Sequence, residues 1–309
     1  MKISVIGAAG TLGSCTTYSL IIRRLADEVV MIDQAEGPLK GHWMDLATVG
    51  NALDIKVIKG TYEDMAGSDI VVMVASAPSG AIKSRSELLP GSIPTVKANV
   101  DKINQYCPKA IVITETNPVD PFNYFTYLMS KDRDRRRYIG YSLNDTIRLK
   151  MWAAKALGVK TSRVDGLVIG EHGNSQVMLF SSLKLDGKPV KLDEATKQHI
   201  REQPNIMLND FETLIPRRTA GWTSGMGTAI VVEAIKNNSQ AVIPCNTVLE
   251  GEYGLRGLSM TVPAVVGKEG IKSVKVLELA PDEKEGLKKT VEAISPFMRY
   301  VEEYKSKNP

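Results

Sequence analysis

The chain has 309 residues, of which 43% are hydrophobic and 24% charged, and its formal net charge is +4. This length allows two domains with a substantial core, and the composition is that of an ordinary globular protein rather than a disordered or fibrous one. The excess of positive charge is too small to predict a nucleic-acid-binding surface. Cys15, Cys107 and Cys245 are odd in number and far apart, which argues against a disulfide framework or a cysteine-based zinc site and favours a reduced, cytoplasmic environment.

The first residues carry no pattern typical of export. A strand-like run follows Met1 and Lys2 directly, so we expect no signal peptide, and no apolar stretch approaches the length that spans a bilayer. The densest basic run, residues 131–137, contains two aspartates and no aromatic side chain. We interpret it as a solvated loop before a strand rather than as a phosphate-binding patch. We therefore expect neither a membrane nor a nucleic acid as a partner.

The start of the chain has the pattern of a dinucleotide-binding unit. Residues 2–7 are predicted to form a strand, and a helical pattern to about residue 26 follows the glycine-rich turn Gly7-Ala8-Ala9-Gly10-Thr11-Leu12-Gly13. Such a turn brings backbone N–H groups to a pyrophosphate at the helix N-terminus. A second predicted strand, residues 28–33, ends in Asp33. An acid there accepts hydrogen bonds from a ribose and repels a 2′-phosphate, so the sequence predicts NAD rather than NADP.

Strands and helices continue to alternate as far as about residue 142. We expect strands at 55–59, 69–75, 110–114 and 138–141, and a helix at 92–107. This alternation is typical of an α/β fold with a Rossmann-type doubly wound parallel sheet, in which ligands bind at the carboxyl ends of the strands. Ser76, Asn117 and Ser142 follow such ends. The predicted cofactor-binding residues are Gly7, Gly10, Thr11, Leu12, Gly13, Asp33, Ser76 and Asn117.

The connection between residues 76 and 92 is long for a compact domain and has no clear period. It contains two glycines and two prolines, and it carries the cations Lys83 and Arg85. Long loops inside compact domains are usually functional or disordered. We interpret the segment as an active-site lid, with a mobile surface loop carrying two solvated cations as the alternative.

From about residue 143 the pattern becomes α+β. We therefore expect a dinucleotide-binding domain at 1–142 and a substrate-binding, catalytic domain at 143–309. The expected helices run from 145 to about 157, from about 193, from about 219 to 237, and from 281. The expected strands cover 164–169, 177–185 and a pair within 240–266, with a hairpin turn at 186–188.

His172 lies between two glycines just after the predicted strand at 164–169, and it is one of only three histidines. A glycine turn lets a ligand approach the backbone closely, and a histidine can both donate and accept a proton near neutral pH. Asp145 and Arg148 are three residues apart on the preceding helix and share a face. They could form a structural ion pair, or serve the histidine and a carboxylate substrate separately. His42 and His199 fall in polar, helix-like surroundings and are not expected to be catalytic.

Together these motifs resemble the lactate/malate dehydrogenase family of NAD-dependent L-2-hydroxyacid dehydrogenases over nearly the whole chain. The resemblance rests on the order and spacing of the glycine-rich turn, Asp33, Met44-Asp45-Leu46, Arg85, Thr116-Asn117-Pro118-Val119-Asp120, Asp145, Arg148, Gly170-Glu171-His172-Gly173 and Thr223. The run at 170–176 resembles the hydroxyisocaproate dehydrogenase branch in particular.

The resemblance implies a role for each of the central residues. His172 would be the general acid/base, oriented by Asp145, and Arg148 would hold the substrate carboxylate through two parallel hydrogen bonds. Arg85 would close over the site and polarise the carbonyl group. The resemblance also implies NAD as cofactor, no metal, a small 2-oxo or 2-hydroxy acid as substrate, and a homodimer or homotetramer.

Two further residues are assigned by the resemblance, and two positions depart from the family. Asn117 would hydrogen-bond the substrate and help to seat the nicotinamide, and Thr223 would line the pocket. The family usually reads the substrate six residues before the lid arginine, with arginine for malate and glutamine for lactate, but Ser79 stands there. A second carboxylate in a closed site needs a cation partner, so the choice among malate, lactate and a bulkier acid stays open. Asn144 replaces the usual leucine beside Asp145, and the lid sequence at 79–84 also differs from the usual one.

The sequence leaves two alternative functions. An NAD-dependent glycosidase shares the architecture but usually needs a metal, and the set of His172, Asp145 and Arg148 argues against it. A non-catalytic NAD-binding protein would keep the fold without turnover.

Overall fold

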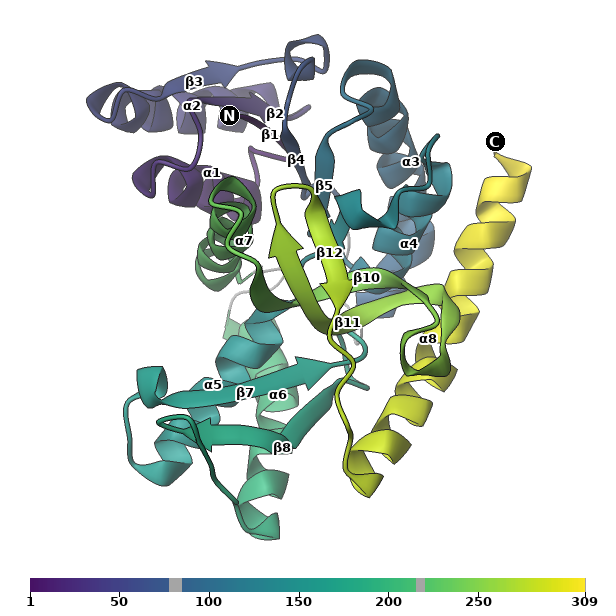
Figure 1. Cartoon of the computed structure of the whole chain (residues 1–309). Coiled ribbons are helices and arrows are strands. Elements are labelled where there is room, and N and C mark those ends of the chain that lie inside the picture. Colours follow the sequence, from purple (N-terminus) through teal and green to yellow (C-terminus); the bar gives the residue numbers. More distant parts are fainter. Residues whose placement is uncertain (78–84, 215–219, 309) are drawn as a thin grey trace.

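The computed structural model describes residues 1–77, 85–214 and 220–308 (Figure 1). Its first half forms the parallel part of a nine-stranded sheet. The strands are β1 (Lys2–Ile6), β2 (Glu28–Ile32), β3 (Lys56–Lys59), β4 (Ile70–Met73), β5 (Ile111–Thr114) and β6 (Tyr138–Gly140). All six lie where the sequence predicts strands. The helices between them are α1 (Thr11–Ile22), α2 (Glu36–Ala52), α3 (Leu89–Tyr106) and α4 (Val119–Met129).

The sequence pattern does not predict α2 and α4. Helix α2 carries Gly37, Pro38 and Gly41 in its first turns, and these residues weaken a helical signal. Helix α4 contains Pro121, an Asp and an Asn and is rich in aromatic residues, all of which have low helix propensity.

Alternate side chains of the central strands enter two separate cores. In β4, Ile70 and Val72 join the cluster that includes residues of α1 and α7 (Gly221–Lys236), while Val71 and Met73 join the cluster under α3 and α4. Successive side chains of a strand point to opposite faces of the sheet. A strand that is apolar at every position is therefore covered by helices on both faces, as expected of a doubly wound sheet.

The second half adds to this sheet and builds a smaller one. Its elements are α5 (Leu143–Leu157), β7 (Val164–Ile169), β8 (Val177–Leu185), β9 (Lys188–Pro189), α6 (Glu194–Leu214), α7, β10 (Ala241–Glu250), β11 (Arg256–Gly267), β12 (Gly270–Val274) and α8 (Pro281–Lys307). Strands β7, β8 and β9 form the small sheet, whereas the large sheet has the order β12-β11-β10-β6-β5-β4-β1-β2-β3. Strand β10 pairs antiparallel with β6 at Asn246 and Gly140. The large sheet thus continues across the boundary expected near residue 142, and the division into two domains stays a prediction.

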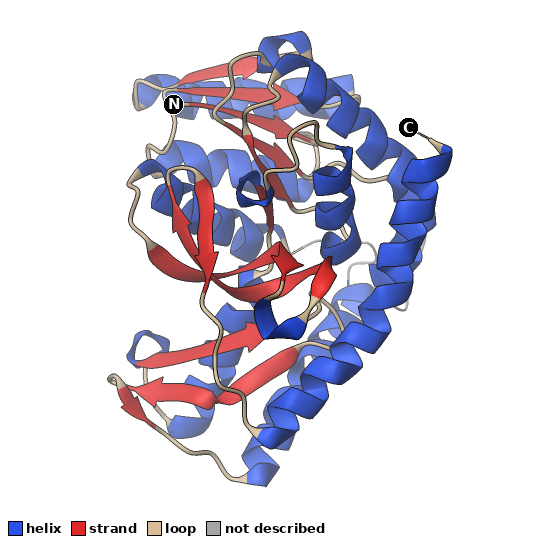
Figure 2. Cartoon of the chain, turned by 45° about the vertical axis from the view of Figure 1, so that its right-hand side comes forward, coloured by secondary structure: helices blue, strands red, loops and turns tan. Residues whose placement is uncertain are grey.

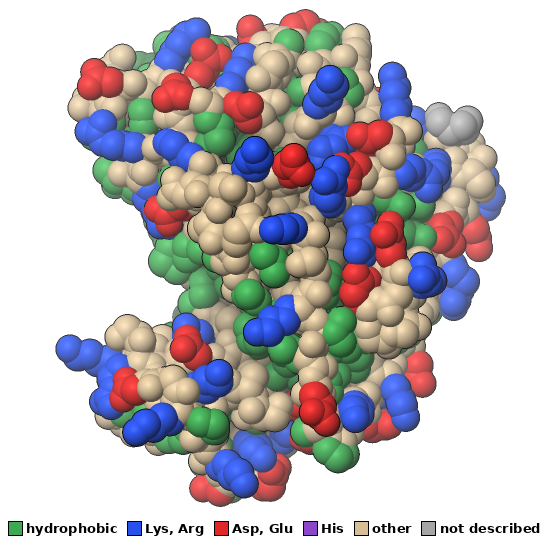
Figure 3. All heavy atoms as spheres, in the orientation of Figure 1, with side chains coloured by type: hydrophobic (Ala, Val, Ile, Leu, Met, Phe, Trp, Pro, Cys, Tyr) green, Lys and Arg blue, Asp and Glu red, His purple; other side chains and the backbone are tan. Residues whose placement is uncertain are grey.

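Short 3-10 turns complete the described chain at Glu63–Met65, Arg85–Leu88, Arg135–Arg137, Thr161–Arg163 and Glu252–Gly254. The face seen in Figure 3 is hollowed between the small sheet and β10. The hollow has a volume of about 630 Å³, and its rim carries Lys150, Asp165 and Lys184.

Helix α8 runs along the outside of the molecule and packs on both α4 and β8 (Figure 2). Its buried residues Leu287, Ile294, Met298 and Val301 fall on one stripe, and most of the exposed side chains of the helix are charged. It therefore joins the large and the small sheet through an amphipathic face. Within the described ranges, no helix is long and apolar enough to cross a bilayer.

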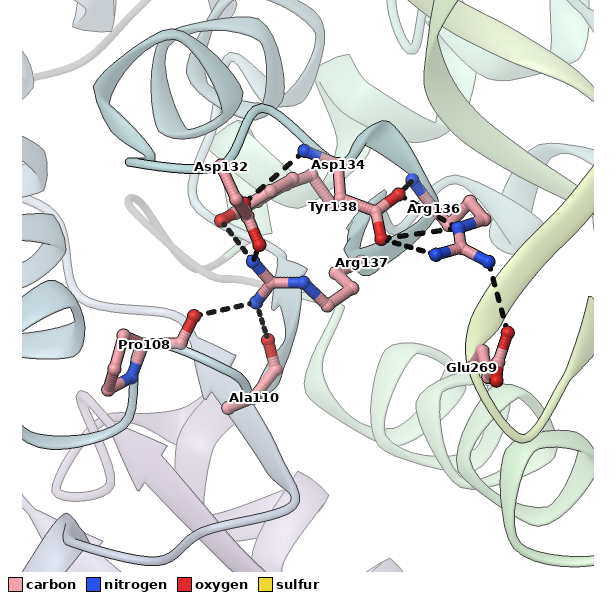
Figure 4. Close-up of polar contacts among 8 residues, drawn as sticks. All are labelled: Pro108, Ala110, Asp132, Asp134, Arg136, Arg137, Tyr138 and Glu269. Atoms are coloured by element: carbon pink, nitrogen blue, oxygen red, sulfur yellow. Dashed lines mark hydrogen bonds and ion pairs between the residues drawn. The ribbon is translucent and has the colours of Figure 1, made fainter.

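Arginines of the basic run before β6 form hydrogen bonds with two neighbouring turns (Figure 4). Arg136 donates to Glu269 in the β11–β12 turn at 3.0 Å. Arg137 donates to the carbonyl oxygens of Pro108 and Ala110, at 2.9 and 3.0 Å, in the turn before β5. The segment precedes a strand as predicted, but both arginines are bound within the chain, and the side chain of Arg137 is only 12% exposed against 50% for Arg136.

Candidate active site

The predicted site residues of the first half gather at one edge of the sheet. Strands β1, β2, β4, β5 and β6 are parallel, so their carboxyl ends lie on the same side. Gly7, Asp33, Ser76, Asn117 and Ser142 each follow one of these ends. The structure thus brings together residues that are up to 135 positions apart (142 − 7).

The glycine-rich turn fits closely against the neighbouring strand ends. Gly7 has φ +96°, and a Cβ atom there would lie 2.6 Å from the backbone nitrogen of Ala75. A Cβ atom on Gly13 would lie 2.1 Å from the carbonyl oxygen of Gly7. Glycine is therefore required at both positions, at the first for conformation and space and at the second for the close approach of α1 to β1.

Asp33 is fixed by the backbone on both sides. Its Oδ2 accepts a hydrogen bond from Ala9 N–H in the glycine-rich turn, and its Oδ1 accepts one from Ala35 N–H, both at 2.9 Å. Each carboxylate oxygen keeps further acceptor capacity. Helix α1 begins next to it at Thr11, and its N-cap Gly10 has no side-chain cap, so first-turn N–H groups can bind an anion. These residues fit a dinucleotide, with the pyrophosphate at α1 and a ribose at Asp33.

The structure brings His172, Asp145 and Arg148 into one buried cluster. His172 Nδ1 lies 2.6 Å from Asp145 Oδ2, and the two side chains are only 5% and 6% exposed. Arg148 Nη1 lies 3.7 Å from the other carboxylate oxygen of Asp145. Asp145 therefore serves the histidine and the arginine at once, which combines the two arrangements that the sequence leaves open. Asp145 lies at Nδ1, so a ligand on the opposite side of the ring would face Nε2.

The loop that carries His172 is held by its backbone. Gly170 exchanges two hydrogen bonds of 2.9 Å with Thr261 of β11, and its φ is +89°. A Cβ atom at Gly170 would lie 2.9 Å from Thr290 Oγ1 of α8, so a larger residue does not fit there. The histidine is thus placed by contacts of the turn as well as by its ring.

Asp120 is a residue of the site whose role the sequence does not reveal. It is fully buried in α4, and its Oδ2 accepts the backbone N–H of His172 at 3.0 Å. Burial, reinforced by the nearby carboxylate of Glu171, raises the pKa of Asp120 well above its usual range. The motif containing Asn117 does draw attention to Asp120, but only the fold shows that its partner lies 52 residues further on.

Three consecutive residues at the start of α5 bind three different neighbours. Asn144 donates to Ser224 of α7 at 2.7 Å, Asp145 binds His172, and Thr146 Oγ1 accepts the N–H of Val168 in β7 at 3.0 Å. Successive residues of a helix point about 100° apart, so one turn can reach several elements. The polar group that Asn144 introduces is therefore satisfied.

A second buried acid lies between β5 and α7. Thr228 Oγ1 of α7 donates to Glu115 Oε1 at 2.8 Å. Burial raises the pKa of Glu115 to about 8, and the Thr228 hydrogen bond opposes this shift.

Asn117 carries a buried acceptor two residues after Glu115. Its Oδ1 atom has no hydrogen-bond partner among the described residues. An orphaned acceptor at a strand end fits the predicted contact of Asn117 with a ligand.

The remaining predicted residues fall in different surroundings. Thr223 is half-buried in the first turn of α7, and Ser76 is exposed after β4. His42 and His199 are exposed on α2 and α6, as expected for surface histidines. Ser79 and Lys83 lie outside the described residues, and so does the side chain of Arg85. In the part of the chain that the structure describes, no group of three or more His, Cys, Asp or Glu is placed to hold a metal ion.

Two family models match the chain almost end to end. The model described as the lactate/malate dehydrogenase NAD binding domain matches residues 1–140, and the one described as the lactate/malate dehydrogenase alpha/beta C-terminal domain matches residues 143–303. The chain belongs to the lactate/malate dehydrogenase family. It is an NAD-dependent 2-hydroxyacid oxidoreductase, so the family, fold class, cofactor and reaction type predicted from the sequence are confirmed.

The sequence relatives of this dehydrogenase include two malate dehydrogenases. It is 33% identical to a malate dehydrogenase of Halobacterium salinarum over 301 residues, which cover 95% of this chain and 97% of the relative. It is 35% identical to a malate dehydrogenase of Parabacteroides distasonis over 300 residues, 95% of each chain.

Solved structures agree with this assignment. A malate dehydrogenase of Cryptosporidium parvum superimposes with a TM-score of 0.90 at 30% identity, covering 98% of this chain and 99% of that one. A lactate dehydrogenase of the same organism, complexed with lactic acid and nicotinamide adenine dinucleotide, gives a TM-score of 0.91 at 29% identity and covers 97% and 98%. These relatives do not choose between malate and lactate for this chain, and the local resemblance to hydroxyisocaproate dehydrogenases stays a prediction.

Proposed function

We propose that His172, Asp145 and Arg148 form the catalytic centre of this dehydrogenase, which interconverts a 2-hydroxy acid and the corresponding 2-oxo acid. The buried contact of 2.6 Å between His172 Nδ1 and Asp145 Oδ2 carries the proposal. A carboxylate that only held a structural histidine would need no arginine beside it. Asp145 also contacts Arg148, whose side chain is only 11% exposed.

The histidine and the aspartate move and stabilise one proton. During oxidation, neutral His172 accepts the hydroxyl proton of the substrate at Nε2, and Asp145 stabilises the resulting imidazolium through Nδ1. During reduction, the imidazolium returns the proton to the carbonyl oxygen. Bound NAD supplies the hydride acceptor or donor. Because both side chains are about 95% buried, the carboxylate acts on the imidazolium with little screening by water.

Substrate orientation is assigned to the neighbouring residues. Arg148 holds the substrate carboxylate, since a planar guanidinium makes two parallel hydrogen bonds where an ammonium cannot. Asn117 binds the substrate oxygen and the amide group of the nicotinamide. It has two groups to offer them, its amino group and the atom Oδ1, which has no hydrogen-bond partner among the described residues. Thr223 lines the pocket from α7, and Arg85 polarises the carbonyl group.

The cofactor is assigned to the strand ends of the first half. The glycine-rich turn from Gly7 to Gly13, including Gly10, Thr11 and Leu12, receives the pyrophosphate, and Asp33 receives the adenine ribose. Ser76 follows β4 beside them. The backbone N–H groups that hold both oxygens of Asp33 support its role, because a fixed carboxylate presents its remaining lone pairs in one direction.

Substrate choice is the point at which a single experiment is most informative. We propose that residue 79 governs it, so that Ser79→Arg improves reduction of oxaloacetate over that of pyruvate and branched 2-oxo acids. NADH oxidation is followed with each acid for wild type and variant. His172→Asn is the catalytic control, expected to bind NADH and lose turnover. No turnover of any 2-oxo acid by the wild type would overturn the proposed function, and full activity of His172→Asn would remove the histidine from it.

We also propose a cytoplasmic homo-oligomer. The free, buried state of Cys15, Cys107 and Cys245 supports a reducing location. On the adjacent helices α1 and α7, Tyr18, Ile22, Trp222 and Met226 are between 43% and 69% exposed, and exposed apolar side chains of this size favour association. Sedimentation velocity gives the mass in solution, and a monomer at all concentrations would contradict the proposal.

A further inference from the structure

Asn144 joins two walls of the proposed site. We propose that Asn144 is a positioning residue: it fixes the first turn of α7, which carries Thr223, against the start of α5, whose first two turns carry Asp145 and Arg148. This inference rests on the proposed function, since it concerns the pocket in which those residues hold the substrate.

The connection is a short chain of hydrogen bonds with Asn144 at its centre. Asn144 Nδ2 donates to Ser224 Oγ at 2.7 Å, and Asn144 Oδ1 accepts the Tyr141 hydroxyl group at 2.8 Å. The same hydroxyl oxygen lies 3.4 Å from the carbonyl oxygen of Thr223. Tyr141, Asn144 and Ser224 are each no more than 5% exposed, so water does not compete for these groups.

The two hydrogen bonds of Asn144 use different ends of its amide group. Its oxygen faces the Tyr141 hydroxyl group and its amino group faces Ser224. An amide supplies both an acceptor and a donor, whereas leucine supplies neither and a carboxylate only accepts.

Helix α7 depends on this connection because it packs directly on Tyr141. A Cβ atom at Gly227, one turn after Thr223, would lie 2.0 Å from the tyrosine hydroxyl oxygen. The backbone of α7 can approach only because residue 227 is glycine. The position of the first turn of α7 thus depends on its packing against Tyr141 and on the hydrogen bond between Asn144 and Ser224.

The position of this turn matters because substrate-holding groups act only in the correct geometry. Arg148 lies on α5 one turn after Asn144, and Thr223 is the neighbour of Ser224. A displacement of about 1 Å between such groups can lower the rate by about a hundredfold. Loss of the Asn144 connection is therefore expected to weaken substrate binding at a site whose residues are all unchanged.

The test separates positioning from stability with four variants. Ser224→Ala removes one end of the connection. Asn144→Leu removes its centre, so that the buried hydroxyl groups of Tyr141 and Ser224 both lose their bond to the amide. The triple variant Tyr141→Phe, Asn144→Leu, Ser224→Ala removes those hydroxyl groups as well, and replacing every partner by an apolar group can be nearly neutral for stability. The matched control is Asn99→Leu, because Asn99 is 2% exposed in α3 and also accepts a tyrosine hydroxyl, at 2.7 Å from Tyr62.

The measurements are the thermal unfolding midpoint, the Kd for NADH, and KM and kcat for the 2-oxo acid that the wild type reduces fastest. We expect Asn144→Leu to lower the midpoint and to raise KM about tenfold or more, without change in the Kd for NADH. The triple variant should recover the midpoint and keep the raised KM, and Asn99→Leu should lower the midpoint alone. If Asn144→Leu does not fold, the triple variant and Ser224→Ala carry the test.

A triple variant with the KM of the wild type would show that Asn144 is merely structural and would overturn the inference. An unchanged KM in Ser224→Ala would do the same. A wild type that reduces no 2-oxo acid would overturn the proposed function, and with it this inference, so the two failures are told apart by the wild type itself.

Discussion

Replacing Asp145 by asparagine tests the centre of the proposed mechanism. The change keeps the size of the side chain and can keep one hydrogen bond to His172, but it removes the charge that stabilises the imidazolium. With Nδ1 and Oδ2 2.6 Å apart, the centres of charge are about 4 Å apart. Two unit charges at about that distance attract each other by about 4 kcal/mol at an effective dielectric constant of about 20.

This attraction sets the size of the expected loss. About 1.4 kcal/mol corresponds to about a factor of ten in rate, so a loss of about 3–4 kcal/mol lowers kcat for 2-oxo acid reduction by two to three orders of magnitude. KM should not rise, because Asp145 also offsets part of the charge of Arg148, 3.7 Å away, and the variant frees that charge for the substrate. The pH profile of reduction should move to lower pH, where His172 is protonated without help.

The assay is steady-state NADH oxidation across a pH series, with the Kd for NADH from fluorescence titration as a check on folding. Asp165→Asn is the control, since this aspartate lies on β7 with its side chain 69% exposed and pairs with Lys150 at 3.2 Å. A kcat for Asp145→Asn within about threefold of the wild type, which is less than about 1 kcal/mol, would refute the charge argument.

Three further changes probe the substrate clamp, the histidine turn and the buried acid. Arg148→Lys should raise KM for the 2-oxo acid about a hundredfold and leave the Kd for NADH unchanged, because an ammonium cannot make two parallel bonds; an unchanged KM would count against the clamp. Gly170→Ala should lower the free energy of unfolding in urea by about 2 kcal/mol. The control Gly187→Ala, also at positive φ (+78°) but in open space, should lose less, and equal losses would show that the contact with Thr290 is unimportant. Burial raises the pKa of Glu115 from 4.5 to about 8, so the folded state holds a proton that the unfolded chain has released. Wild-type stability relative to Glu115→Gln should therefore fall as the pH rises from 4.5 to about 8 and then level off; a difference independent of pH would contradict the shift.

Local patterns were sufficient for the strands of the first half of the fold. The strands that precede Gly7 and Asp33 are short, apolar and bounded by clear turns, and each of them is a strand of the parallel sheet. Helix α4 shows the limit of this reasoning. Most of its residues have low helix propensity, so the helix depends on packing against β5, β6, α3 and α8, and only the assembled structure supplies those neighbours.

The antiparallel strands of the second half show a different limit. The sequence predicts a strand pair within residues 240–266, and β10 and β11 confirm it. Nothing in the pattern tells that β10 pairs with β6, more than 100 residues earlier, so that one sheet extends through both halves. The pairing of a strand depends on which edge is free when the chain folds, and that is a property of the whole topology.

Sequence alone determined the chemistry available to this dehydrogenase. Glycines at fixed spacing and an acid after the second strand predict NAD. The order of these motifs with a histidine, an aspartate and an arginine resembles a family that acts on 2-hydroxy acids. Tertiary structure decided how these groups share their partners. It placed the Asp145 carboxylate between His172 and Arg148, and it brought Asp120 to the backbone N–H of His172. It also enclosed Asn144 between Tyr141 and Ser224. Contacts of this kind join residues far apart in the chain, and their strength comes from burial, which only the folded molecule creates.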